Sequence, residues 1–232
     1  MNLFSLNRFR SGVKSPAIYY PGGNFEVNNW TLSTFVVKKL VPIVGTHPFP
    51  VSELLLLAGA FCWTAPTHVF DWGTHIGKSA RIFYETGRYF RIRSEFHSID
   101  LPNQSDHQEH PGKQRGSLVR HLPSVHLHTG DGVTTALSIL KQSKLVSTRP
   151  LFFLDGDHNY ETVYRELTNI LSTYPQAHLL VHDTFDQASS SGYNTGPHRA
   201  VVELLRQQPE GHTTLSVSTG LPGMTFLYPR RQ

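Results

Sequence analysis

Acidic residues end each of the five β-strands that the sequence predicts. These residues are Asp71, Asp100, Asp131, Asp155 and Asp183. A single acid at a strand end is usually a turn or helix-capping residue. Five of them would meet along one edge, however, because the carboxyl ends of the strands in an open α/β sheet line the ligand crevice. The pattern therefore predicts a binding site built on carboxylates.

The last two strand ends carry histidines as well as acids. His158 follows Asp155 on the same turn, and His182 directly precedes Asp183. Converging carboxylates repel one another unless a cation lies between them, and oxygen ligands suit Mg²⁺. We therefore expect Mg²⁺ or another divalent cation at Asp155, His182 and Asp183; alternatively, Asp155 contacts a cofactor alone and Asp183 caps a loop. His158 is the candidate general base, because the pKa of histidine lies near neutrality.

A glycine-bearing turn joins the first predicted strand, residues 69–72, to a helix that begins at Ser79. Gly73 and Gly77 stand in the turn, with His75 between them. Turns of this kind bind nucleotide-like ligands in open α/β sheets. The dinucleotide fingerprint, however, needs its second glycine where this chain has His75. The turn therefore disfavours an NAD(P)-dependent oxidoreductase, which stays open as an alternative.

The acids around this turn suit an adenosine that carries an amino-acid tail. Asp100, at the end of the second strand, has the usual place of an acid that accepts ribose hydroxyls. Asp131 would accept from the adenine amino group, and Asp71 would face an ammonium group. A ligand that needs all of these acids and has no phosphates is S-adenosylmethionine rather than NAD.

Strands alternate with helices from residue 69 onward. The predicted strands are 69–72, 96–100, 125–129, 150–154 and 177–181, the intervening helices are 79–87, 133–141, 160–171 and 197–206, and a hairpin of 215–218 with 224–228 ends the chain. Such alternation predicts a parallel sheet with helices on both faces. We expect an α/β, Rossmann-like doubly wound sheet of seven strands, mostly parallel with an antiparallel C-terminal strand.

Residues 1–50 are interpreted as an N-terminal arm or lid, ahead of a domain that spans residues 51–232. Prolines and glycines interrupt the first segment. A helix is expected over residues 30–40 with Asn29 or Thr31 as its cap, and Ser52 is expected to cap a buried helix after it. The segment would cover a small-molecule site, or it would pack on the domain or on a second subunit, which makes a homo-oligomer possible.

Composition narrows the function classes. The chain has 232 residues with 21 Lys and Arg against 17 Asp and Glu, and the basic residues are spread along it, so an ordinary surface is favoured over nucleic-acid binding. The longest apolar run, residues 54–63, is too short for a membrane span. One cysteine, Cys62, excludes disulfides and cysteine-based zinc sites. With no signal-peptide pattern, we expect a cytoplasmic protein.

The polar interval 102–124 is expected to form an exposed loop with a short helix near residues 114–121. His107 and His110 stand three positions apart and would be metal ligands on a helix turn. Pro111 and Gly112 follow directly, and they favour a solvated loop over that metal pair.

Four segments together resemble the class I S-adenosylmethionine-dependent methyltransferases. They are residues 69–79, 154–161, 181–184 and 196–201. The resemblance is nearest to the small-molecule O-methyltransferases grouped with the cephalosporin hydroxylase-like and macrolide-sugar methyltransferases. The most specific piece is Leu-Asp-Gly-Asp-His-Asn-Tyr-Glu at 154–161, since many Rossmann-like proteins share the glycine turn. The resemblance covers about residues 52–228.

The resemblance implies a site and an activity. It implies that the cofactor is bound by Asp71, Gly73, Thr74, His75, Gly77, Ser79, Asp100, Asp131, Gly132 and Asp155. It implies catalysis by His158 and Asp155, with His158 where catechol-type O-methyltransferases have a lysine. Asp155 and Asp183 would bind a cation, beside His182 where relatives often have a second acid. The implied activity is methyl transfer to a hydroxyl of a sugar, phenol or natural product; a non-catalytic cofactor-binding protein is the other alternative.

Overall fold

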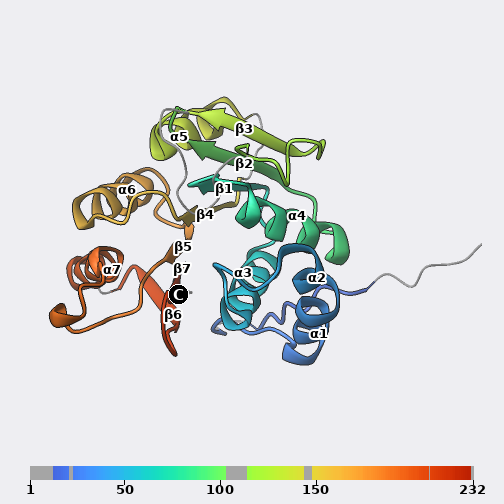
Figure 1. The fold of residues 1–232 in the computed structure, drawn as a ribbon, viewed down its shortest axis with the longest axis horizontal. Coiled ribbons are helices and arrows are strands. Elements are labelled where there is room, and N and C mark those ends of the chain that lie inside the picture. The colour runs from blue at the N-terminus through green and yellow to red at the C-terminus, as the bar shows by residue number, and fades with distance from the viewer. Residues whose placement is uncertain (1–12, 21–22, 103–113, 144–147, 209, 231–232) are drawn as a thin grey trace, which may run out of the picture.

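A mixed β-sheet forms the centre of the protein (Figure 1). The structure is a computed structural model that describes residues 13–20, 23–102, 114–143, 148–208 and 210–230. Within these residues the sheet has seven strands in the order β3-β2-β1-β4-β5-β7-β6. The strands are β1 (His68–Trp72), β2 (Glu95–Asp100), β3 (Val125–Thr129), β4 (Pro150–Leu154), β5 (His178–His182), β6 (His212–Val217) and β7 (Met224–Pro229).

The strands β1 to β5 pair in parallel, and β7 runs antiparallel to both β5 and β6. The expected Rossmann-like sheet with an antiparallel C-terminal strand is therefore confirmed. The order of strands reverses between β1 and β4, where Trp72 pairs with Leu154. Ligands of open α/β sheets bind outside the carboxyl ends of the strands at such a reversal. The segments after Trp72 and Leu154 therefore leave the sheet side by side.

Helices cover both faces of the sheet, as Figure 1 shows. On one face lie α5 (Gly132–Gln142), α6 (Tyr160–Thr173) and α7 (Gly196–Gln207). On the other lie α3 (Val51–Thr64) and α4 (Lys78–Phe90), with α1 (Asn29–Phe35), a π-helical segment (Val36–Leu40) and α2 (Val41–Val44) outside them. A short 3₁₀ turn, Ser189–Ser191, precedes α7. Among the described residues, none of these helices has the length and apolar character needed to cross a membrane.

The central strands are buried on both faces, so their sequences are nearly continuous runs of apolar residues. In β4, Leu151 and Phe153 pack under α3 and α4, while Phe152 and Leu154 pack under the helices of the other face. This two-sided burial explains why residues 150–154 are predicted as a strand with the observed bounds. Ends of the other predicted strands and helices differ from the structure by a few residues.

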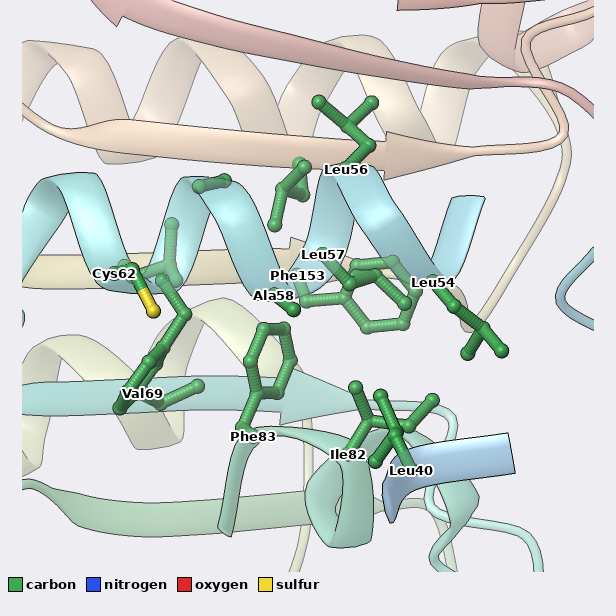
Figure 2. Close-up of a cluster of buried hydrophobic side chains, with 14 of the residues drawn as sticks. Leu40, Leu54, Leu56, Leu57, Ala58, Cys62, Val69, Ile82, Phe83 and Phe153 are labelled. Carbon is green, nitrogen blue, oxygen red and sulfur yellow. The ribbon is translucent and has the colours of Figure 1, made fainter. Parts of the chain in front are cut away.

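α3 is the buried helix of the first face. Figure 2 shows Leu54, Leu57 and Cys62 of α3 in one cluster with Phe83 and Phe153. Burial raises the pKa of the Cys62 thiol, as suits a structural side chain.

The caps predicted for two helices are wrong. Pro50, rather than Ser52, is the N-cap of α3, because its extended backbone (φ −56°, ψ 162°) lets the helix begin two residues earlier, at Val51. Asn28 caps α1, since its side-chain oxygen accepts the Thr31 N–H at 3.0 Å. Neither predicted cap of that helix, Asn29 or Thr31, has the role. Adjacent polar residues compete for such positions, and only the backbone turn decides between them.

The N-terminal helices share a core with the rest of the chain. Leu32, Phe35 and Leu40 are buried in the same apolar cluster as α3 and α4. Phe49, just before α3, packs against Phe153 at the carboxyl end of β4. Whether residues 1–50 act as a lid stays a prediction.

Residues 115–121 form hydrogen-bonded turns, and the short helix predicted there is wrong. Val119 and Arg120 both donate their N–H groups to the carbonyl of Gly116. Gly116 has a left-handed backbone (φ +64°), which interrupts a regular helix at this point. The expected pair His107 and His110 lies outside the described residues.

Histidines from three adjacent strands lie together near the β3 edge of the sheet. His68 Nδ1 is 3.2 Å from His97 Nε2, and His97 Nδ1 is 3.1 Å from His128 Nε2. An N–H···N bond needs one neutral ring as its acceptor. Burial, and then the neighbouring His128 and His68, lower the pKa of His97 to about 3. The folded protein therefore holds His97 neutral.

We expect His97 to make the protein sensitive to acid. Its unfolded pKa, near 6.5, exceeds the folded value, so the unfolded state takes up the extra proton as pH falls from 6.5 towards 3. His97→Gln removes this proton uptake. The deficit in unfolding free energy of the variant should shrink from pH 7 to pH 4, by at most about 1.4 kcal/mol per pH unit.

Urea unfolding of wild type and variant at several pH values measures that deficit. The exposed His121 supplies the control, His121→Gln, whose stability should follow the wild type at each pH. The buried acids Asp71 and Glu166 have raised pKa values and act in the opposite direction, but both proteins carry them, so they cancel in the comparison. A deficit that is constant from pH 7 to pH 4 would contradict the assignment.

Candidate functional site

The glycine turn after β1 lies directly against the end of β4. Gly73 has φ +88° and donates its N–H to the carbonyl of Ile99 at 3.1 Å. A Cβ atom on Gly73 would stand 2.7 Å from the carbonyl carbon of Asp155. Only glycine permits this approach, because real Cβ atoms do not come so close to backbone. The predicted cofactor turn and the predicted catalytic acid are therefore in contact.

Asp71 lies beneath the turn rather than in the open. Its side chain is buried, with the Ser98 hydroxyl 2.8 Å from its Oδ2 atom. The same hydroxyl is 2.9 Å from Thr74 Oγ1, so this bond supports the turn from below. Burial raises the pKa of Asp71 to about 7, although Ser79 and Ser98 hydroxyls oppose the shift. The expected contact of Asp71 with a cofactor ammonium group stays a prediction.

Asp100 faces the turn from the end of β2. Its Oδ2 atom accepts the His75 N–H at 3.2 Å, and its Oδ1 atom accepts the Leu101 N–H at 2.8 Å. His75 has φ +45°, and this backbone turns its N–H towards Asp100. Arg115 Nε lies 3.0 Å from the same carboxylate, a partner that the sequence did not indicate. Asp100 therefore already has donors where ribose hydroxyls are expected.

Asp131 and Gly132 form the beginning of α5. Asp131 Oδ1 accepts the Thr134 N–H at 2.8 Å, and its Oδ2 atom lies 3.6 Å from Arg165. Burial would raise the pKa of Asp131, but the bonds from Thr134 outweigh it and lower the pKa. A Cβ atom on Gly132 would meet the Trp72 ring at 2.6 Å. Asp131 thus has the helix-capping role that a strand-end acid often has, and its contact with adenine stays a prediction.

The ends of β4 and β5 bring two acids and two histidines together. His182 Nδ1 is 2.8 Å from Asp155 Oδ1 and 3.3 Å from Asp183 Oδ2. His158 Nε2 is 3.1 Å from Asp183 Oδ2 and 3.7 Å from Asp155 Oδ1. Adjacent parallel strands explain the meeting, since β4 and β5 pair directly. All four residues predicted for catalysis and metal binding here do converge.

The charges in this cluster stabilise one another. Burial would raise the pKa of Asp155, but the facing His182 and His158 outweigh it and lower the pKa to about 2. Burial lowers the pKa of His182, but Asp155 leads the groups that raise it well above its usual value. The bond to Asp155 is the largest cause that raises the pKa of His158. Each carboxylate of the cluster therefore favours the protonated form of a facing imidazole, and each imidazole favours the ionised form of a facing carboxylate.

The candidate metal ligands fit one ion. One ligand atom from each of Asp155, His182 and Asp183 lies within 4.8 Å of the other two. Neighbouring ligand atoms on an octahedral ion with bonds of about 2.1 Å stand about 3.0 Å apart, and opposite ones about 4.2 Å. The contacts of His182 Nδ1 at 2.8 and 3.3 Å match the first spacing. A divalent cation would need only small side-chain shifts.

Two residues of the cluster were not predicted as members of it. Glu53, in the first turn of α3, is 2% exposed, and its Oε2 atom lies 3.1 Å from His182 Nε2. Its Oε1 atom accepts the Gly223 N–H at 2.9 Å. A lone acid at the start of an apolar helix was the available signal, because buried glutamates are almost always paired. The Tyr193 hydroxyl donates to Asp183 Oδ1 at 2.9 Å.

Asp157 does not join the acids. Its Oδ1 atom accepts the Asn159 N–H at 3.0 Å, and its Oδ2 atom accepts the Thr162 hydroxyl at 2.7 Å. These bonds fix the turn that begins α6. By ordering this turn, Asp157 holds His158 in place without facing the site.

Comparisons with known proteins place the fold. No protein-family model matches the chain, and no curated protein matches its sequence. Solved structures do match. An SAH complex of the O-methyltransferase from Bacillus cereus has a TM-score of 0.52 and 15% identity, over 85% of this chain and 90% of that one. This is a Rossmann-like methyltransferase fold. At this identity, the methyltransferase likeness concerns the fold alone.

Two further methyltransferase structures support the same likeness. SAH-bound PaMTH1 from Podospora anserina has a TM-score of 0.51 and 15% identity, covering 76% of this chain and 77% of that one. CalS11, a TDP-rhamnose 3'-O-methyltransferase of calicheamicin biosynthesis, has a TM-score of 0.51 and 15% identity over 86% of this chain and 92% of that one. The methyltransferase fold therefore extends over most of each chain.

Proposed function

We propose that the protein is an S-adenosylmethionine-dependent methyltransferase that acts on a hydroxyl group of a small molecule. One observation carries the proposal: Asp155 touches the Gly73 turn with its backbone and His158 with its side chain. A candidate general base thus stands beside the turn where a methyl donor would bind. The likeness to SAH-bound methyltransferases of the same fold supports it.

The turn and the acid beside it would suit such a cofactor. Gly73 lets the turn lie against the backbone of Asp155 at the carboxyl edge of the sheet, and Asp100 accepts the His75 N–H of the same turn from the end of β2. An acid in that place suits ribose hydroxyls. Arg115 would have to share Asp100 with the ribose or move aside. When bound, S-adenosylmethionine would supply an activated methyl group on its sulfonium.

His158 would remove the proton of the acceptor hydroxyl. Its Nε2 atom faces the shared space between Asp155 and Asp183, and its side chain is 42% exposed, so an acceptor can reach it. The two carboxylates would stabilise the imidazolium that forms after proton transfer. Asp155, His182 and Asp183 would hold a divalent cation, whose chemistry would be to bind the hydroxyl and lower its pKa. Holding the acceptor close to the donor would supply much of the rate.

The acceptor class rests on the chemistry of these groups. A neutral imidazole and a cation both assist an oxygen nucleophile, which must lose its proton in the transfer. The name of CalS11 states a sugar hydroxyl as that enzyme's acceptor. We therefore propose a sugar, a phenol or another natural-product hydroxyl as the methyl acceptor of this protein.

A transfer assay tests the proposal. The protein is incubated with S-adenosylmethionine, a divalent cation and a panel of phenols and sugar nucleotides, and S-adenosylhomocysteine is measured by mass spectrometry. We expect product with at least one hydroxyl acceptor and none with the methyl ether of the same compound. Product formed only with amines or thiols would refute the hydroxyl assignment. Oxidation of the panel with NAD(P)⁺, and no methyl transfer, would refute the methyltransferase.

A further inference from the structure

Resting on the proposed function, we infer that Glu53 holds His182 as a nitrogen ligand and thereby makes this a site for a first-row transition metal rather than for Mg²⁺. Three observations support this inference: the direction of the two ring nitrogens of His182, the two bonds of Glu53, and the combination of oxygen and nitrogen ligands at the ends of β4 and β5.

The two nitrogens of His182 face different partners. Nε2 points to Glu53 Oε2 at 3.1 Å, while Nδ1 points between Asp155 and Asp183 at 2.8 and 3.3 Å. A metal-binding histidine typically donates its other ring N–H to a carboxylate, which fixes the tautomer and the ring orientation. With Nε2–H given to Glu53, Nδ1 is the nitrogen left for an ion, which would take the place of the proton that Nδ1 shares with Asp155.

The ring of His182 cannot turn away from this direction. It is 4% exposed, and the ring of Phe49 packs edge-on against it with the ring centres 4.9 Å apart. The ring centre of Phe153, on the neighbouring strand β4, lies 6.2 Å from that of His182. Aromatic packing and the Glu53 bond together orient Nδ1 before any ion arrives, and such preorganisation favours binding.

Glu53 is fixed in turn by a second donor. Its Oε1 atom accepts the Gly223 N–H at 2.9 Å, in the loop between β6 and β7. Glu53 thus has two N–H donors, one for each carboxylate oxygen. Glutamine in its place has only one acceptor oxygen, so its NH₂ group would face either His182 or Gly223 and break one of the two bonds.

The donor set determines which ion is preferred. Asp155 and Asp183 supply oxygen, and His182 supplies an imidazole nitrogen. Imidazole suits Zn²⁺, Fe²⁺, Co²⁺ and Ni²⁺, whereas Mg²⁺ prefers carboxylates, carbonyls and water. The sequence predicts Mg²⁺ or another divalent cation at Asp155, His182 and Asp183, and the geometry of His182 favours a transition metal among these ions.

Metal titration of the full chain, without S-adenosylmethionine, tests the inference. Chelator-treated protein is titrated with Co²⁺ and with Mg²⁺ by calorimetry, and Co²⁺ is also followed by its visible absorption. We expect one high-affinity Co²⁺ site, tighter than Mg²⁺ by about tenfold or more. Asp155→Asn should abolish that site. Equal affinity for the two ions, or no Co²⁺ site removed by Asp155→Asn, would overturn the inference.

Glu53→Gln tests the role of the glutamate. Loss of the carboxylate behind a ligand typically lowers metal affinity by about 10- to 100-fold, so we expect a drop of about tenfold for Co²⁺. The control is Glu166→Gln, because Glu166 is also buried but bonds to Trp72 under the opposite face of the sheet; its Co²⁺ affinity should match the wild type. Wild-type Co²⁺ affinity in Glu53→Gln would overturn the role.

Two safeguards keep the outcomes distinct. If Glu53→Gln does not fold, as circular dichroism would show, Glu53→Asp tests the same bond, and the Co²⁺ to Mg²⁺ ratio of the unaltered protein needs no variant. Binding of S-adenosylhomocysteine is measured separately without metal. A protein that binds S-adenosylhomocysteine but prefers Mg²⁺ would refute only the inference about Glu53, whereas one that binds Co²⁺ but no S-adenosylhomocysteine would refute only the methyltransferase.

Discussion

Gly73→Ala is expected to destabilise the protein by about 2–5 kcal/mol and to weaken binding of S-adenosylhomocysteine by more than about tenfold. Two costs add. A left-handed backbone (φ +88°) costs an L-residue about 1–2 kcal/mol. The new Cβ would stand 2.7 Å from the carbonyl carbon of Asp155, and making room costs about 1–3 kcal/mol more. Because the obstacle is backbone, β1 and β4 must move apart, which also displaces Asp155 from the cofactor turn.

Gly45→Ala is the matched control for this experiment. Gly45 also has a positive φ (φ +70°, ψ −164°), but nothing lies within 4 Å of the added Cβ. Gly45→Ala should therefore lose only a backbone cost of about 1–3 kcal/mol and keep its affinity for S-adenosylhomocysteine. Thermal unfolding and calorimetric titration measure the two quantities. If the two variants lose the same stability and both bind S-adenosylhomocysteine normally, the contact between the turn and Asp155 is not needed for cofactor binding.

His158→Ala is expected to slow methyl transfer by about 10²- to 10⁴-fold, the usual contribution of a general base. The variant should bind S-adenosylhomocysteine like the wild type, because His158 contacts Asp155 and Asp183 rather than the glycine turn. The effect should therefore lie in kcat more than in the affinity for the donor. Single-turnover transfer rates, with the acceptor found by the panel, measure it.

The control for the base is His121→Ala, at an exposed histidine in the turns after residue 114. It should transfer methyl groups at the wild-type rate. Wild-type turnover in His158→Ala would remove the proposed base, and an equal loss in both variants would point to a general loss of structure. Circular dichroism of both variants at the assay temperature separates the second outcome from the first.

Much of the fold could be predicted because the central strands have a local sequence pattern, a short apolar run. β4 is a run of apolar residues, buried on both faces, and Asp155 follows it directly. The convergence of Asp155 with Asp183 followed from the same logic, since both come after neighbouring parallel strands. Caps were less predictable: Pro50 and Asn28 cap helices whose neighbours are equally good candidates by residue type.

Contacts between distant segments were beyond the reach of sequence patterns. Glu53 meets His182 across 129 positions of the chain, and no local pattern joins a helix start to a strand end that far away. Asp131 shows a second limit of sequence patterns: a local pattern does not fix the role of the residue. Its place at a strand end predicts a ligand contact, yet its bond to the Thr134 N–H is a local cap. The sequence does not distinguish a strand-end acid that faces a ligand from one that caps the following helix.

Calorimetric titration of the unaltered protein with S-adenosylhomocysteine, and separately with NADH, tests the central claim most directly. Both ligands carry an adenosine, so they distinguish the proposed amino-acid tail from a dinucleotide at the Gly73 turn. We predict one S-adenosylhomocysteine site in the micromolar range, with affinity reduced by Asp100→Ala, and no binding of NADH. Binding of NADH with no detectable binding of S-adenosylhomocysteine would contradict the assignment of this protein as a methyltransferase.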